Sequence, residues 1–271
     1  MSPVLVARRS AVWGFVNAVV TVTARDVTLV VRSPSSLTMS LVMPIVMMGL
    51  VGGNLMQNMA GGLTYDFGTF MLVGMVINQL FMTTTMGMAS LVDDSDGHFS
   101  AELLVSPASR YAIVIGKILG SGFMALISAV IVIIVGLVMG LRLAGWQLLA
   151  LLGLSPLMVL AGGALAMMVF GVVRSKKAAN MVGLLITMPS MFLSGVIIPI
   201  AQSAGLLMVL SRILPMTYCV DLGRAIVYAG NPQFGTVVLF NPVISLAAIV
   251  ALTVVCLIVG TYLWVRTEKN R

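Results

Sequence analysis

Apolar residues along this chain fall into long runs separated by short polar breaks. A helix needs about 20 residues to cross a bilayer, and six runs approach or exceed that length: residues 35–53, 67–92, 111–141, 146–173, 180–201 and 242–265. Lipid leaves backbone groups no partner outside a helix or a closed barrel, and the alternation of a barrel is absent here. The pattern therefore predicts an all-α integral membrane protein with six transmembrane helices.

The stretch between the fifth and sixth spans does not read as a free loop. Residues 198–240 are apolar, yet prolines and glycines break them at five positions: Pro199, Gly205, Pro215, Gly230 and Pro232. Two helical pieces remain, 204–213 and 218–228, and both are too short to cross. We expect broken or re-entrant helices in the outer leaflet, where protein must cover irregular backbone. A seventh span is the alternative.

The first 34 residues differ from the spans in carrying four arginines: Arg8, Arg9, Arg25 and Arg32. A cleavable signal would need a compact apolar core followed by a small-residue cleavage site, and this segment instead runs on past Arg25. Trp13 and Leu29 beside the arginines favour an amphipathic helix in the cytoplasmic interface. A disordered basic tail is the alternative.

Composition supports the membrane reading. The chain is 60% hydrophobic and 8% charged with a mean hydropathy of +1.12, which excludes an ordinary water-soluble domain. The spans consume most of its 271 residues and leave no room for a separate catalytic domain. The net charge of +7 comes from residues beside apolar spans rather than from basic clusters with aromatics, so no nucleic-acid partner is expected.

Basic residues also orient the predicted spans. With six spans, twelve basic residues fall on the side of both termini, and only three fall on the other: Arg142, Arg212 and Arg224. By the positive-inside rule, both termini and the loop after residue 92 are cytoplasmic. The predicted organisation is a cytoplasmic N-terminus with the interfacial helix (1–34), a six-span domain (35–265) and a cytoplasmic tail (266–271).

The polar break from Asp93 to Lys117 is the most distinctive loop. Glu102 lies in the first turn of a short helical run that Ser100 precedes and Ser106-Pro107 ends, and Arg110 follows. A run of about two turns is too short to be stable alone, so it must lie against something. A solvated loop between two spans is the alternative.

Polar residues inside the second span are candidates for a transport pathway. Asn78 and Thr85 share one helix face, as do Gln79 and Thr83, with Met86 a turn beyond Thr83. They either line a pathway or tie helices together. None is ionised, which favours an external energy source over a proton or sodium relay.

Other candidate chemistry is sparse. Asp221 and Arg224 are three residues apart and are predicted to pair on one helix face as a structural clamp. His98 is the sole histidine, so neither a metal site nor a catalytic triad is expected, and Cys219 and Cys256 read as packing residues. The glycine pairs Gly49/Gly53, Gly116/Gly120 and Gly136/Gly140 would permit close helix approach. The alternative, favoured for any one pair, is that glycine is simply common in membrane helices.

Several stretches resemble the six-span permease subunits of ABC-2 type exporters, a family that includes daunorubicin-resistance and polysaccharide or lipooligosaccharide export permeases. The stretches, in family order, are Arg25-Asp26 with Arg32-Ser33-Pro34 and Pro44, residues 102–110 with Lys117, Phe192-Leu193-Ser194-Gly195 with Pro199, and residues 214–218 with Asp221 and Arg224. The second of these resembles the cytoplasmic coupling segment of the family, which implies that Ser100, Glu102, Ser106, Pro107 and Arg110 contact an ATPase.

The resemblance implies an ATP-driven exporter of drugs, antibiotics, lipids or lipid-linked glycans in a bacterial cell membrane. Two permeases, identical or related, would pair, and separate ABC ATPase subunits would bind ATP and Mg²⁺. The chain has no G-x-x-x-x-G-K-[ST] phosphate loop, so it is not expected to be an enzyme or to hold a cofactor itself. An ion-coupled secondary transporter, or a membrane anchor or intramembrane enzyme, is the alternative.

Overall fold

The computed structural model describes residues 3–32, 42, 45–52, 65–92, 110–141, 143–173, 175–197, 200 and 205–269. Over these residues the chain is helical and has no strands. The elements are α1 (Pro3–Val31), the π-helical stretch η1 (Met47–Gly52), α4 (Phe67–Gly87), α7 (Arg110–Val138), α8 (Gly145–Phe170), α9 (Lys176–Leu193), α10 (Leu206–Ile213), α11 (Pro215–Val227), α12 (Phe234–Val237) and α13 (Pro242–Lys269).

Four of the described helical segments are long and apolar enough to cross a membrane: Phe67–Val92, Tyr111–Val138, Gly145–Phe170 and Phe234–Thr267. They correspond to the predicted second, third, fourth and sixth spans. The predicted fifth span corresponds to α9, which is apolar but shorter than these four. The predicted first span, 35–53, lies mostly outside the described residues, so six spans are not confirmed.

The predicted broken pair is present as α10 and α11, which meet at an angle of 85° and could form one broken span or a re-entrant loop. The second piece begins at Pro215 rather than at residue 218 as predicted. A proline is compatible with the first turn of a helix because its missing N–H would have no partner there. The break at Pro215 was therefore predicted correctly, and only the start of the second piece was placed three residues too late.

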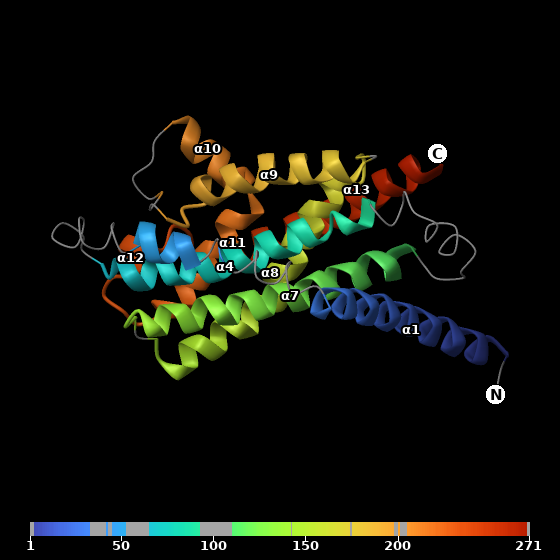
Figure 1. Cartoon of the computed structure of the whole chain (residues 1–271), viewed down its shortest axis with the longest axis horizontal. Coiled ribbons are helices and arrows are strands. Elements are labelled where there is room, and N and C mark those ends of the chain that lie inside the picture. The colour runs from blue at the N-terminus through green and yellow to red at the C-terminus, as the bar shows by residue number, and fades with distance from the viewer. Residues whose placement is uncertain are drawn as a thin grey trace.

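The long helices lie side by side along the long axis of the molecule, with α4 in their midst (Figure 1). Helices α7, α8, α9 and α11 all contact α4. Most residues of α4 are buried inside the protein. Helix α1 packs against α7, and α13 packs against α8. Helices α7, α8, α9 and α11 therefore determine the surroundings of the polar residues on α4.

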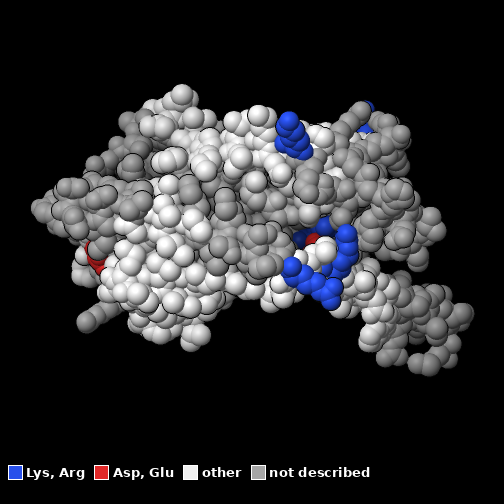
Figure 2. All heavy atoms as spheres, in the orientation of Figure 1, with Lys and Arg blue, Asp and Glu red and all other residues white. Residues whose placement is uncertain are grey.

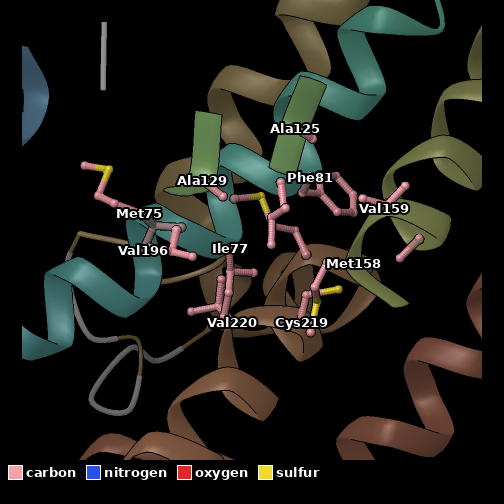
Figure 3. Close-up of a cluster of buried hydrophobic side chains, with 14 of the residues drawn as sticks. Met75, Ile77, Phe81, Ala125, Ala129, Met158, Val159, Val196, Cys219 and Val220 are labelled. Atoms are coloured by element: carbon pink, nitrogen blue, oxygen red, sulfur yellow. The ribbon is translucent and has the colours of Figure 1, made fainter. Parts of the chain in front are cut away.

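Side chains from α4, α7, α8 and α11 meet in one apolar core (Figure 3). Ile77 and Phe81 of α4 lie between Ala125 of α7 and Cys219 of α11 in this view, and all four are buried. Both cysteines are buried and free, as predicted. Close packing of this kind holds membrane helices together, because lipid supplies no hydrophobic drive for their association.

Helix ends are fixed by polar side chains at the end of the bundle where α4 begins. Asp66 caps α4 by accepting hydrogen bonds from Gly68 N (3.1 Å) and Thr69 Oγ1 (2.6 Å). Tyr228, directly after α11, donates its hydroxyl to Asp66 O at 3.1 Å. The start of α4 is thereby attached to the end of α11.

Candidate coupling and transport elements

The predicted ATPase-contacting segment lies between two neighbouring helices. Ser100, Glu102, Ser106 and Pro107 are outside the described residues, and Arg110 begins α7. The span containing α4 ends at Val92, and α4 and α7 pack along each other. Residues 93–109 therefore connect the ends of two adjoining helices.

A polar cluster joins three helices close to this connection. Lys117 Nζ of α7 donates to Asp26 Oδ1 of α1 at 3.2 Å and lies 3.2 Å from its Oδ2. The same ammonium donates to Ser90 Oγ, in the last turn before Val92, at 3.1 Å. The side chain of Lys117 is 3% exposed and that of Asp26 is 12% exposed. Because this end is the one predicted to be cytoplasmic, we call Asp26, Ser90 and Lys117 the cytoplasmic joint.

Helix α1 approaches α7 at backbone distance beside this joint. An added Cβ at Gly116 would lie 2.8 Å from Val22 Cβ, and one at Gly120 would lie 2.7 Å from Asp26 Cβ. Thr23 Oγ1 also lies 3.1 Å from its acceptor, Gly116 O. The predicted role of the pair Gly116/Gly120 in close helix approach is thus confirmed, with α1 as the partner.

The described basic side chains are unevenly distributed on the face drawn in Figure 2. On the face drawn in Figure 2, the blue lysine and arginine atoms lie in the half toward the C-terminus of α13, with an acidic side chain enclosed within one group of them. The positive-inside rule predicts that this end is cytoplasmic.

Three of the predicted pathway residues share one side of α4 by helical spacing, and Met86 among them lies against α9. Gln79 Nε2 donates to Thr83 Oγ1 at 2.9 Å, one turn along the same helix. Met86 follows on this side, and its Sδ would lie 2.9 Å from a Cβ at Gly183 of α9. Asn78 is on the adjacent face and is 8% exposed, and its Oδ1 accepts no hydrogen bond within the described part of the chain.

The hydroxyl of Thr85 connects α4 to a second helix. Thr85 Oγ1 lies 2.8 Å from Phe81 O of its own helix and 3.1 Å from Gly162 O of α8. Gly162 permits this approach, because a Cβ there would lie 2.7 Å from Phe81 O.

Replacing Thr85 by valine is expected to lower the free energy of unfolding by about 1 kcal/mol, the usual scale of a hydrogen bond between membrane helices. Thr84→Val is the matched control, because Thr84 is equally buried and its hydroxyl bonds only to Leu80 O of its own helix. Thermal unfolding in detergent would compare the two. Equal midpoints for both variants would show that the bond to α8 contributes nothing.

Asp221 and Arg224 each have their own partners instead of the predicted mutual pair. The Asp221 carboxylate accepts from Leu239 N (2.6 Å), Phe240 N (3.2 Å) and Ser245 Oγ (2.7 Å), which fixes the start of α13. No ion pair within 4.0 Å joins the two side chains among the described residues. The i, i+3 spacing predicted both on one side of α11, but each side chain binds groups outside α11 that lie closer.

Arg224 is a buried clamp on three helices. It is 2% exposed, and its Nη2 donates to Gly195 O (2.7 Å) and Val196 O (3.2 Å), directly after α9. Its guanidinium lies 3.4 Å from the ring centroid of Phe70 on α4. Gly74 leaves room for the clamp, since a Cβ there would lie 2.6 Å from Val196 O.

Sequence reasoning missed the role of Asp26 and Ser90 in the joint. The sequence does mark Asp26 as unusual, because it is an acid inside an otherwise apolar and basic helix. Its partner is 91 residues away, however, and no local spacing rule connects them.

Comparison of the sequence with known protein families identifies the family of this chain. The model of the ABC-2 type transporter family matches residues 17–228, which extend from the middle of α1 to the end of α11. No curated protein matches the chain.

Proposed function

Because the chain belongs to the ABC-2 type transporter family, and is therefore a multi-pass membrane permease component of an ABC transporter, we propose that it works as an exporter subunit driven by a separate ATPase. The family match carries this proposal, since it covers both helices that border residues 93–109. The proposed substrate is hydrophobic or amphipathic: a drug, an antibiotic, a lipid or a lipid-linked glycan. Resistance to an exported antibiotic would be one consequence.

The proposed contact with the ATPase is the segment from residue 93 to Arg110, with Ser100, Glu102, Ser106 and Pro107 at its centre. ATP and Mg²⁺ bind to the partner, and a second permease, identical or related, completes the transporter in a bacterial cell membrane. Supporting geometry comes from the helices beside the segment. Since α4 and α7 pack along each other, a push on the segment would move both.

We place the substrate path along the side of α4 that carries Gln79, Thr83 and Met86, with Asn78 beside it. On the facing helix α9, Thr187 and Ser190 follow Gly183 and donate to Gly183 O and Ile186 O of their own helix at 2.8 and 2.6 Å. Gln79 likewise donates within α4. None of these three hydrogen bonds joins α4 to α9, so they would remain intact if the two helices separated. This suits an interface that opens and closes during transport.

The test is purification of the tagged chain from its own membrane in mild detergent. We expect an ATPase with a phosphate-binding loop to co-purify, and the double variant Glu102→Ala/Arg110→Ala to lose most of it. Arg212→Gln is the control, because Arg212 is exposed on α10, in the predicted outer part of the chain, and should leave co-purification unchanged. A wild-type chain that purifies without any ATPase would contradict the proposal.

A further inference from the structure

The cytoplasmic joint connects α1 to both helices that border the segment 93–109. Ser90 lies on the α4 side, three residues before the segment begins, and Lys117 lies on α7, eight residues after it ends. Asp26 of α1 accepts from the same ammonium that donates to Ser90. One buried cation therefore links three helices at a single point.

Packing around the joint leaves little freedom for sliding. Gly116 and Gly120 bring the backbone of α7 against Val22 and Asp26 of α1, so the joint lies within the tightest part of this interface. On the other side of α7, a Cβ at Gly87 of α4 would lie 2.6 Å from Ser121 Cβ. Ser121 in turn donates to Lys117 O at 2.9 Å. All three helices are thus in close contact at the level of Lys117.

Breaking the joint during a conformational change would be costly. Breaking a buried ion pair by removing one partner is strongly destabilising. Lys117 is almost completely buried, so its ammonium has little access to water once Asp26 moves away. A displacement of the segment is therefore expected to carry α1 along rather than pull the charges apart.

We infer that Asp26, Lys117 and Ser90 are positioning residues that make α1 move as one body with the ends of α4 and α7 that border residues 93–109, so that α1 passes motion of the ATPase to the part of the chain that follows residue 32. The inference rests on the proposed function and adds a mechanical role for α1. Its position suits that role, because α1 ends at Val31 and the predicted first span begins at residue 35.

Two kinds of variant separate charge from packing. Asp26→Asn removes the charge pair and keeps the side-chain volume, while Gly120→Leu keeps both charges and forces α1 away from α7. Both are expected to lower chain-dependent ATP turnover by the co-purified ATPase roughly tenfold, within the range that coupling residues show. The exchange Asp26→Lys with Lys117→Asp restores an opposite-charge pair and should regain most of the turnover. Rescue would show that the pairing of opposite charges, and not either side chain alone, is what the turnover requires.

A matched control removes a different charge from the same helix. Arg32 is exposed at the end of α1, and Arg32→Gln should leave turnover unchanged. Retained binding of the ATPase and an unchanged helical circular dichroism spectrum would show that each variant is folded.

A distance measurement tests the single-body motion itself. Spin labels at Ala24→Cys on α1 and Leu119→Cys on α7 occupy exposed positions, in a chain with Cys219 and Cys256 replaced by alanine. The distribution of distances between the two labels should be the same with and without ADP and vanadate on the ATPase. In the Asp26→Asn chain the distribution should be broader. A nucleotide-dependent change in the unaltered joint, or full turnover in Asp26→Asn, would overturn the inference.

The outcomes distinguish this inference from the proposed function. If the wild-type chain and Asp26→Asn bind and stimulate the ATPase equally well, the role of the joint is contradicted and the proposed function stands. A wild-type chain that affects no ATPase removes the proposed function and the transmission role together.

Discussion

The variant Arg224→Met is expected to lower the free energy of unfolding by about 3 kcal/mol, the largest loss for any single side chain considered in this chain. Methionine fills a similar volume but cannot donate to Gly195 O and Val196 O, and each buried carbonyl left without a partner costs about 1–3 kcal/mol. The guanidinium contact with the Phe70 ring, worth up to about 2 kcal/mol when desolvated, is lost as well. Relief of the cost of burying the charge offsets part of this sum.

Thermal unfolding of the purified chain in detergent measures the effect. For a chain of this size, about 3 kcal/mol corresponds to a fall of about 6–10 °C in the midpoint. Arg212→Met is the matched control, because Arg212 also lies over a ring, 5.7 Å from the centroid of Phe240, but is exposed. The control should change the free energy of unfolding by less than about 0.5 kcal/mol. Equal midpoints for the two variants would refute the clamp.

The variant Gly260→Ala is expected to destabilise the chain by about 2–3 kcal/mol. A Cβ at Gly260 of α13 would lie 2.5 Å from Met168 N and 2.6 Å from Met167 C, which are backbone atoms of α8. Backbone atoms inside a helix cannot turn aside as a side chain can, so the two helices must move apart. Overpacking of this kind costs about 1–3 kcal/mol.

Gly153→Ala is the control for this prediction. Gly153 is exposed on α8, and no atom lies within 4 Å of the position that its Cβ would take. Alanine is the better helix former, by up to about 1 kcal/mol, so this variant should unfold at the same temperature as the parent chain or at a higher one. A fall in the midpoint for Gly153→Ala comparable with that for Gly260→Ala would show that helix contact is not the cause.

Hydropathy alone predicted most of the helical architecture. Four predicted spans coincide with helices long enough to cross a membrane, because a run of apolar residues in lipid has few alternatives to a helix. The bend between α10 and α11 was also predicted, since Gly205 and Pro215 interrupt an apolar stretch. These features depend on local composition, which a single sequence shows directly.

Long-range partners could not be predicted in the same way. The i, i+3 rule put Asp221 beside Arg224, but the start of α13 and the end of α9 offered better-placed groups that only the folded chain brings near. Among the glycines, the predicted Gly116/Gly120 pair does lie in a helix contact, whereas Gly140 has φ +89° and nothing within 4 Å of its Cβ position. Among the described glycines, the closest approaches to backbone atoms are at Gly260 and Gly74, which no spacing pattern marked.

The central claim is that an ATPase drives this permease through the segment from residue 93 to Arg110. The most direct measurement is ATP hydrolysis by the co-purified ATPase in lipid nanodiscs, alone, with the wild-type chain, and with Glu102→Ala/Arg110→Ala. The account predicts that the wild-type chain changes the hydrolysis rate and that the folded double variant does not. Hydrolysis that is the same in all three preparations would contradict it.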